Sequence, residues 1–503
     1  MTDLLLGIDI GTTNIKAVLA TPEGWIIAQA HTNYPIHHPK PGWAEQDPAD
    51  WWRGTVEVTR AVLANAPARP EQIVGIGVSG QGCAVTLIDK AGDVIRPAII
   101  WLDTRSESQC EQMRRCCHAE ILQRNGKLPA PYNADPVLQW LHKHEPESIA
   151  TAQTSLTSTG YINFKLTGQP VENLSDASIL FAFDLASGDW SPALVNAFEL
   201  PGKLYPEVAP CSQVIGELTP AAAAELGLNP GVPVVAGGED TSSAGLAIGV
   251  TEPGQALLSL GTAGTIYIVE DKPIVHPQLL AFLHVLSGQT LLGGSMAAVG
   301  AGLNWIRKLF GAEFDYLQLS EMAQQSPPGA GGVIFLPYLS GELQPINDGH
   351  ARGVFFGLTM STTPAHMVRA VMEGAAFAIA HNIDIAREAG SILTELRAVG
   401  GPTQSELWCR IIANVTGYPL TVLADNAGAP LGNALLAAAG IGLISDPAET
   451  ARKGARITRQ FEPNPKFREA YVELFSIYKQ LYPQLKAQFA ALAAIKDIHE
   501  EPQ

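Results

Sequence analysis

The chain has 503 residues, of which 46% are hydrophobic and 16% charged, a composition typical of a well-packed globular protein. A single hydrophobic core stops growing at about 250–300 residues, so we expect two domains. The formal net charge of −17 disfavours binding to nucleic acid or to an anionic membrane, and we expect neither as a partner. An anionic cofactor would need local backbone donors or a metal.

The sequence shows no recognisable secretion signal or membrane-spanning stretch, and together with the cysteine usage this leads us to expect a cytoplasmic protein. The opening residues MTDLLLGIDI carry Asp3 where a secretion signal would carry positive charge, and Asp9 interrupts the apolar stretch. The most apolar later stretch, residues 434–444, is shorter than the ~18–20 residues that span a bilayer. The cysteines form no CxxC pair, and we interpret them as reduced thiols: Cys83, Cys110, Cys116, Cys117, Cys211 and Cys409.

The first hundred residues alternate between strand and helix patterns, which predicts an α/β fold. Asp47 is a candidate N-cap with Pro48 at the first helical position. The predicted strands are 4–10, 14–20, 25–31, 72–80 and 84–92, and the predicted helices are 46–64 and 104–117.

The start of the chain has a counterpart near its middle. Residues 4–20 and 256–270 each contain an apolar strand, a Gly-Thr turn and a second apolar strand, and the turns at Gly11 and Gly261 are offset by 250 residues. Glycine-containing hairpins also recur by coincidence, but a duplicated domain explains the offset better. We expect domains at 1–249 and 250–503, with a linker near 249–255.

A long helix is predicted in the second half of the chain, because the sequence has clear signals for both its start and its end. Thr363 is a candidate N-cap, Pro364 suits the first turn and Gly390 suits the end. Apolar residues at helical spacing predict one buried face, formed by Met367, Val371, Ala375, Ala378 and Ile379. Further elements are expected over 396–417 (strand, glycine turn, helix), 418–424 (strand), 428–442 (small-residue helix) and 467–494 (long helix).

The two Gly-Thr turns are candidate phosphate-binding sites, because glycine lets backbone N–H groups approach an anion closely. Two such turns facing each other would grip a polyphosphate from both domains. Asp9, an otherwise costly carboxylate in an apolar strand, would then act on the Mg²⁺ that accompanies the nucleotide, directly or through water. The candidate residues are Gly11, Thr12, Thr13 and Lys16 in the first turn region, and Gly261, Thr262 and Thr265 in the second.

A third glycine turn, GGPTQS, lies between a predicted strand and a helix. Gly400, Gly401 and Ser405 would suit the adenosine part or the phosphates of a nucleotide, or they form a plain loop. The chain has no GxxxxGK[ST] motif and no kinase-type GxGxxG followed by the expected lysine, so the P-loop and protein-kinase interpretations lose their main support.

Asp240, in GGEDTSSAGLAIG, follows an apolar strand and precedes a small-residue helix. It can accept a proton from a substrate hydroxyl as that oxygen attacks phosphorus, or it can simply cap the helix. Glu239 adds a second negative charge, so a neutral hydroxyl binds here more readily than a phosphate without metal.

Six segments, spread over nearly the whole chain, resemble the FGGY carbohydrate kinases, which belong to the sugar kinase, heat-shock and actin ATPase superfamily. The matching segments, in family order, are GIDIGTTNIKAVL, GGEDTSSAGLAIG, SLGTAGT, ARGVFFGLT, GGPTQSELWCRIIANVTG and GAPLGNALLAAAGIG. The resemblance implies two RNase H-like domains with an ATP site in the cleft between them. It also implies that Asp240 is the general base and that Asp9 is the carboxylate associated with magnesium.

The resemblance further implies nucleotide contacts at Gly300 and Asn304, although Gly300 equally suits helix packing. The expected sugar-binding residues carry alternatives too. Gln81 would bond sugar hydroxyls or backbone, Trp101 would stack on the sugar or lie in the core, and Asp103 would orient the substrate with Arg105 or cap a helix beginning at Thr104. Thr241 would touch the substrate or cap a helix.

Departures from the family pattern fall at the expected sugar site. Xylulose kinases usually have Met-His where this chain has Gly82-Cys83, Leu102 replaces a frequent Asn or Gln, and Leu343 replaces an arginine. Pro402 replaces the third glycine of the adenosine motif. None of these changes removes a catalytic group.

Together with these residues, the resemblance implies an ATP- and Mg²⁺-dependent kinase for a terminal hydroxyl of a small sugar, with a ketopentose such as xylulose as the first candidate. The alternatives are another polyol or ketose (glycerol, erythritol or L-xylulose) and, in a different class, an ATP-gated regulatory protein like actin or the chaperones. The expected partners are the sugar and ATP, and a homodimer is left open.

Overall fold

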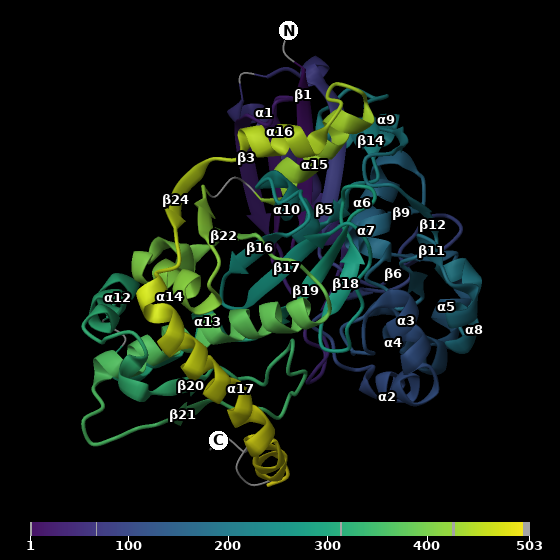
Figure 1. The fold of residues 1–503 in the computed structure, drawn as a ribbon. Coiled ribbons are helices and arrows are strands. Elements are labelled where there is room, and N and C mark those ends of the chain that lie inside the picture. The colour runs from purple at the N-terminus through teal and green to yellow at the C-terminus, as the bar shows by residue number, and fades with distance from the viewer. Residues whose placement is uncertain (1–2, 67, 312–313, 425–427, 496–503) are drawn as a thin grey trace.

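The computed structural model describes residues 3–66, 68–311, 314–424 and 428–495. Two seven-stranded sheets, one from each half of the chain, form the frame of the molecule (Figure 1). Strands and helices are interspersed along the described chain, which gives the α/β class that the sequence predicts.

The first sheet contains the predicted N-terminal meander. β1 pairs antiparallel with β2, which pairs antiparallel with β3, and β1 also pairs in parallel with β5. The order is β13-β14-β5-β1-β2-β3, and β15 pairs with β5. The bounds are β1 (Leu4–Ile10), β2 (Asn14–Ala20), β3 (Ile26–Asn33), β5 (Ile73–Gly80), β13 (Val214–Glu217), β14 (Pro233–Val235) and β15 (Gly238–Glu239).

The second sheet repeats this pairing. β16 pairs antiparallel with β17 and in parallel with β22, as β1 does with β2 and β5, and the order is β18-β19-β17-β16-β22-β23-β24. The two Gly-Thr turns therefore occupy equivalent places in two sheets. The bounds are β16 (Gln255–Leu260), β17 (Gly264–Glu270), β18 (Leu280–Leu283), β19 (Thr290–Met296), β22 (Glu395–Val399), β23 (Leu420–Leu423) and β24 (Ile457–Phe461).

One face of the first sheet is covered by α1 (Pro48–Asn65), α6 (Ser158–Thr167) and α9 (Pro220–Leu226). Asp47 caps α1 by accepting the Ala49 N–H at 2.9 Å, as predicted. The remaining elements of this half are α2 (Glu107–Cys116), α3 (His118–Asn125), α4 (Ala134–His144), α5 (Pro146–Thr151), α7 (Leu174–Ala177), α8 (Pro192–Ala197), η1 (Pro70–Gln72), η2 (Gly202–Leu204), β4 (Glu45–Gln46), β6 (Thr86–Ile88), β7 (Ala98–Ile99), β8 (Thr154–Leu156), β9 (Val171–Asn173), β10 (Phe183–Asp184), β11 (Asp189–Trp190) and β12 (Glu207–Ala209).

The central helix of the second half is α13 (Pro364–Glu388), which Thr363 caps as predicted. The sequence predicts one buried face, but every residue from Val368 to Ala380 is buried. The reason is that α11, α12, α14, α17 and the second sheet surround it. The neighbouring elements are α11 (Gly300–Phe310), α12 (Tyr316–Gln324), α14 (Glu406–Thr416), α16 (Pro447–Gly454), α17 (Pro465–Ala493), η3 (Ala330–Gly332), η4 (Gly401–Gln404), β20 (Ile334–Leu336) and β21 (Val354–Phe356).

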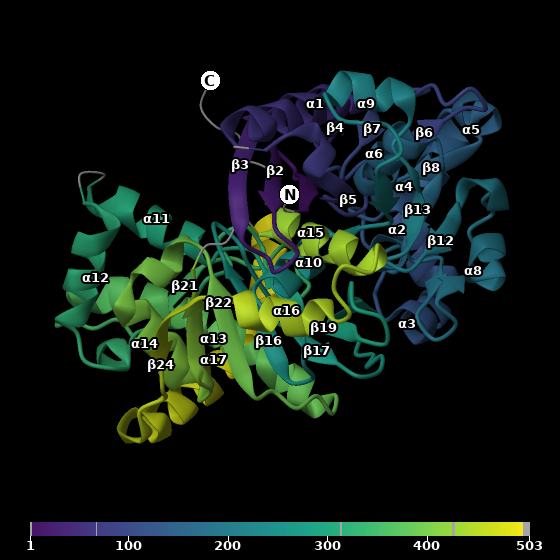
Figure 2. The same cartoon turned by 90° about the horizontal axis from the view of Figure 1, so that it is seen from above.

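Two helices, α10 (Asp240–Ala247) and α15 (Ala429–Gly440), lie between the sheets (Figure 2). α15 comes from the second half of the chain but packs on β1 and β5 of the first sheet. The approach is so close that a Cβ at Gly7 would lie 1.8 Å from the Pro430 carbonyl oxygen. This contact ties a helix from the second half of the chain to the first strand.

Among the described residues, no helix combines the length and the apolar character that a membrane crossing requires.

Candidate active site

Asp9 is the penultimate residue of β1, with 6% of its surface exposed. Its Oδ1 accepts a hydrogen bond from the Ser79 hydroxyl of β5 at 2.9 Å. Burial, and then the negative charge of Asp240, raise the pKa of Asp9 to about 6, while Lys16, its cross-strand neighbour, lowers it. Asp9 and Asp240 are therefore close enough to interact electrostatically.

Asp240 is the first residue of α10, and Glu239 rather than Asp240 caps this helix. The Glu239 carboxylate accepts the Ser242 N–H at 2.7 Å, so the alternative in which Asp240 is the N-cap is wrong. Asp240 is half-buried, and its Oδ1 accepts a hydrogen bond from the Thr241 hydroxyl at 2.9 Å. Burial, and then the charge of Glu239, raise the pKa of Asp240 well above its usual range.

The first Gly-Thr turn, residues 11–13, contacts two of the expected sugar-binding side chains, one directly and one indirectly. The Trp101 indole N–H donates to the Thr12 hydroxyl at 2.9 Å. Gln46 donates to the Thr12 carbonyl at 2.7 Å and accepts a 2.7 Å hydrogen bond from the Gln81 amide. The phosphate turn and the expected sugar site are therefore joined by one hydrogen-bond network.

Two side chains of this network could contact a ligand: the Trp101 ring is exposed, and Gln81 has an oxygen without a hydrogen-bond partner. Trp101 is 42% exposed, so the interpretation of Trp101 as a core residue is wrong. Gln81 is 1% exposed, and its Oε1 has no hydrogen-bond partner. A buried acceptor without a partner is costly, which is consistent with a ligand hydroxyl completing it.

Asp103 and Arg105 form a buried ion pair with an Nη2–Oδ2 distance of 2.7 Å. The same guanidinium contacts Glu45 at 2.8 Å and lies 3.7 Å from the centre of the Trp43 ring, and its Nη1 has no partner. Helix α2 begins at Glu107 and its N-cap residue is Ser106, so Asp103 does not cap it. Asp103 instead fixes the arginine in place.

The second Gly-Thr turn supports the start of α11. The Gly300 N–H donates to the Gly261 carbonyl at 2.9 Å, and the Ala301 N–H donates to the Thr262 carbonyl at 3.0 Å. A Cβ at Gly300 would lie 2.4 Å from the Gly261 oxygen, so close packing requires glycine there. Thr265 lies on β17 with its hydroxyl buried and without a partner.

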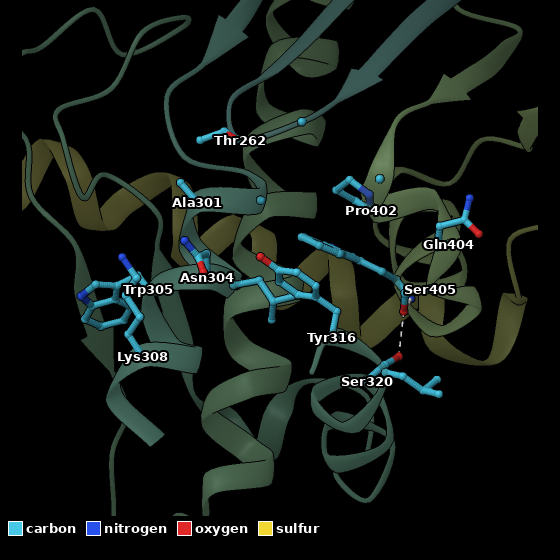
Figure 3. A pocket seen from close by; sticks show the side chains of 16 residues that line it. Thr262, Ala301, Asn304, Trp305, Lys308, Tyr316, Ser320, Pro402, Gln404 and Ser405 are labelled. Carbon is cyan, nitrogen blue, oxygen red and sulfur yellow. Dashed lines mark hydrogen bonds between the residues drawn. The ribbon is translucent and has the colours of Figure 1, made fainter. Parts of the chain in front are cut away.

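A pocket of about 660 Å³ opens beside this turn, between α11, α12 and α14 (Figure 3). Its walls include hydroxyls of Ser320 and Ser405 that face each other at 2.7 Å, and Ser405 also caps α14. Six of the residues predicted to bind ATP line it: Gly261, Thr262, Gly300, Asn304, Gly401 and Ser405.

The other predicted ATP-binding residues lie elsewhere. Gly400 lines a neighbouring cavity of about 390 Å³, and a Cβ on it would lie 1.9 Å from the Leu260 oxygen. The first turn region, with Gly11, Thr12, Thr13 and Lys16, is carried by the first sheet together with Asp9 and is not part of the pocket lining that the described residues form. Only the second-half residues are thus brought together in one pocket.

Sequence reasoning missed several pocket residues, namely Trp305, Lys308, Tyr316, Ser320 and Trp408. Tyr316 is 52% exposed and Trp408 is 2% exposed. Trp408 belongs to a segment that the sequence singled out, but α12 carries no motif. The apolar residues of α12 show helical spacing, but this pattern does not reveal that Tyr316 reaches a pocket built by distant segments.

The pocket fits a nucleoside by size and chemistry. Its aromatic walls suit a purine ring, and the Asn304 Oδ1 is buried without a partner. The described residues contain no cluster of three or more His, Cys, Asp or Glu arranged to hold a metal.

Comparisons with known proteins agree with this geometry. The FGGY family of carbohydrate kinases matches residues 4–247 with its N-terminal domain and residues 256–441 with its C-terminal domain. The chain is 31% identical to a xylulose kinase of Escherichia coli K12, covering 96% of this chain and 99% of that one. It is 30% identical to a glycerol kinase of Alkalilimnicola ehrlichii, covering 87% and 90%.

The crystal structure of xylulose kinase from Rhodospirillum rubrum superposes with a TM-score of 0.92 at 33% identity and covers 97% of this chain and 100% of that one. The predicted fold class, α/β with two domains of the actin-like type, is thereby confirmed. The predicted resemblance is confirmed as well.

Proposed function

We propose that this chain, which belongs to the FGGY family of carbohydrate kinases, transfers the γ-phosphoryl group of ATP to a hydroxyl of a small sugar. The observation that carries this proposal is the arrangement around Asp240. Its carboxylate is not used as a helix cap, it interacts with Asp9, and Thr12 of the nearby turn bonds Trp101.

Asp240 acts as the general base. Its raised pKa makes it a better proton acceptor than an exposed aspartate, and the Thr241 hydroxyl orients it. It takes the proton of the sugar hydroxyl as that oxygen attacks phosphorus. The neutral acid that results is favoured by the burial and by the charge of Glu239 that raise its pKa.

The nucleotide binds in the pocket between α11, α12 and α14. Tyr316 and Trp408 flank the base, and Asn304 and Ser405 offer polar contacts. ATP supplies the γ-phosphoryl group when bound, and Mg²⁺ neutralises charge on its phosphates. Asp9 would hold the ion directly or through water.

The two Gly-Thr turns bind the phosphates from opposite domains, with Thr12, Thr13 and Lys16 on one side and Thr262 on the other. We place the domains at 1–249 and 250–503, because α10 ends at Ala247 and β16 begins at Gln255.

For the sugar, we propose a ketopentose, with xylulose as the first candidate because xylulose kinases are among the relatives. Gln81, with its unpartnered Oε1, and the exposed Trp101 are the contacts that the structure leaves free, whereas Asp103 and Arg105 orient the site through their ion pair. Gly82 and Cys83 depart from the family pattern, and glycerol, erythritol and L-xylulose remain alternative substrates.

The test is ATP turnover against a panel of pentuloses, polyols and hexonates, with ADP release as the readout. We expect one compound to raise turnover by orders of magnitude over the sugar-free rate. A flat response to every sugar would contradict the kinase proposal and favour the ATP-gated regulatory protein.

A further inference from the structure

Two adjacent thiols lie at the junction between α2 and α3, away from the site described above. Cys116 is the last residue of α2, and Cys117 joins it to α3 with φ −145° and ψ 14°, outside the helical region. This break brings the two Sγ atoms to 2.7 Å from each other. That separation is not far above the ~2.0 Å of an S–S bond.

The two thiols differ in access. Cys116 is exposed, whereas Cys117 is 7% exposed and belongs to an apolar cluster with Met113 and Ile121. Burial raises the pKa of Cys117 to about 12, and the Cys116 side chain adds to this effect. An external reagent therefore reacts with Cys116 first, and the buried Cys117 is adjacent to attack in a second step.

The remaining cysteines do not compete for such a reagent. Among the described residues, Cys83, Cys110, Cys211 and Cys409 are all buried. Burial also raises the pKa of Cys110, on the same helix, to about 12. Thiolates are the reactive form, so these four are poor nucleophiles.

A hollow of about 400 Å³ lies beside Cys116 and gives a reagent room. It is lined by Ser108, Glu111, Gln112, Arg115 and Cys116. Arg115 and Glu111 form an exposed ion pair at 3.3 Å, so the hollow offers both signs of charge. A zwitterionic molecule, such as the disulfide of a glutathione-type peptide, matches that chemistry.

We propose that Cys116 and Cys117 form a vicinal dithiol site, which a low-molecular-weight disulfide oxidises reversibly to an intrachain disulfide. The site lies outside the residues that carry the proposed kinase function, so it stands or falls independently of that function.

The reaction balances in two steps. The Cys116 thiolate attacks one sulfur of the small disulfide, which forms a mixed disulfide and releases one small thiolate. Cys117 then loses its proton, attacks the Cys116 sulfur and expels the second small thiolate. Two electrons pass from the protein to the small disulfide, and the two protons end on the two small thiols.

The product should be easily reduced. Adjacent Cα atoms are about 3.8 Å apart, below the ~4.4–6.8 Å that unstrained disulfides span. Strained and exposed disulfides have the more oxidising potentials of labile, regulatory bonds. We therefore expect excess reduced glutathione to restore both thiols fully.

The test is intact-mass and peptide-map analysis of the full-length reduced protein after incubation with oxidised glutathione. We expect the wild type to lose two hydrogen atoms, with the new bond mapped between residues 116 and 117. Cys117→Ser should stop at a stable mixed disulfide on Cys116, and Cys116→Ser should not react.

Cys211→Ser is the matched control, because it also removes one thiol and its hydroxyl can still donate to Asn173 as the Cys211 thiol does. It should react as the wild type does. Should Cys117→Ser fail to fold, Cys116→Ser, which changes an exposed side chain, still decides the outcome. A wild type that keeps all its thiols, or that stops at the mixed disulfide, would overturn the proposal.

Discussion

At the scale of single residues, Glu239 determines what Asp240 can do. Because the Glu239 carboxylate satisfies the Ser242 N–H, the neighbouring carboxylate is released from the capping role that its sequence position suggests. The same neighbour raises the pKa of Asp240. One residue thus frees the proposed base and tunes it.

Replacing Asp240 by Asn removes the proton acceptor while keeping the shape of the side chain. We expect phosphoryl transfer to fall by about 10²–10⁴-fold, the usual contribution of a general base. Nucleotide affinity, measured by calorimetry on the same preparation, should stay within about a factor of three, since Asp240 does not line the nucleotide pocket. Unchanged turnover would remove Asp240 from the mechanism.

Asp9 should show a conflict between stability and function. Its pKa is raised from 3.8 to about 6, so the folded chain holds a proton that the unfolded chain releases between these values. The free energy of unfolding therefore falls as the pH rises from about 4 to 6. One pKa unit is worth about 1.4 kcal/mol, so ionised Asp9 costs the nucleotide-free fold about 3 kcal/mol at pH 7.

Asp9→Asn should then stabilise the nucleotide- and magnesium-free protein by about 2–3 kcal/mol at pH 7 and by nearly nothing at pH 4, while kinase activity and its Mg²⁺ response are lost. Urea unfolding at both pH values measures the difference, with exposed Asp93→Asn as the control for the charge change. An Asp9→Asn protein that is less stable than the wild type at pH 7 would refute the assignment of a costly buried charge.

At the scale of elements, α15 depends on glycines that let backbones touch. A Cβ at Gly432 would lie 2.0 Å from the Ser243 carbonyl oxygen of α10, and a Cβ at Gly77 of β5 would lie 2.3 Å from the Asn433 oxygen. Because these neighbours are backbone atoms, they cannot turn aside as a side chain could. The helix between the sheets is therefore fixed by the absence of side chains.

Gly432→Ala should destabilise the protein by about 2–3 kcal/mol, because overpacking outweighs the roughly 1 kcal/mol that alanine gains in a helix. Gly202→Ala, where nothing lies within 4 Å of the added Cβ, should change stability by less than about 0.5 kcal/mol. The midpoints of urea unfolding of the two variants, compared with that of the wild type, measure these changes in stability. Equal midpoints would contradict the close contact.

Elements with strong local signals could be predicted from the sequence. The caps at Asp47 and Thr363, each followed by proline, mark helix starts that the structure confirms. The two similar segments that lie 250 residues apart form equivalent hairpins in two equivalent sheets. These features depend on neighbouring residues or on repetition, and both can be read along the chain.

Features that depend on distant segments could not be predicted. Tyr316 reaches the proposed nucleotide pocket because α12 packs against α13 and α14, and α13 is buried all round because other helices and the second sheet enclose it. Asp240 was a candidate N-cap of α10, but the Glu239 carboxylate accepts the Ser242 N–H and caps the helix instead. The local sequence fits a cap at Asp240 as well as a catalytic base there. Packing decides such cases, and packing is a property of the whole fold.

At the scale of the whole molecule, the halves are joined along the edge strand β18 as well as through α15. Lys127 of the first half donates to the Ala281 carbonyl at 2.5 Å and to the Ser178 carbonyl at 2.9 Å. The Ser178 hydroxyl oxygen accepts a hydrogen bond from the Leu283 N–H at 2.8 Å. This seam holds the second sheet against the first half while leaving the pocket beside α11 free.

Lys127→Met should destabilise the protein by about 3 kcal/mol or more, because buried carbonyls lose their donor. Burial lowers the pKa of Lys127 from 10.5 to about 7, so between these values the unfolded chain binds more protons. The advantage of the wild type over the variant should therefore grow as the pH rises from 7 to 10. Exposed Lys203→Met is the control, and a difference that shrinks as the pH rises would contradict the lowered pKa of Lys127.

The most direct test of the whole account is where the γ-phosphate of ATP goes. With the sugar found in the panel, ³¹P NMR should show a sugar phosphate monoester that appears in step with ADP, and Asp240→Asn should abolish both signals together. Inorganic phosphate as the sole product, at a rate indifferent to the sugar, would mean that the molecule hydrolyses ATP and phosphorylates nothing.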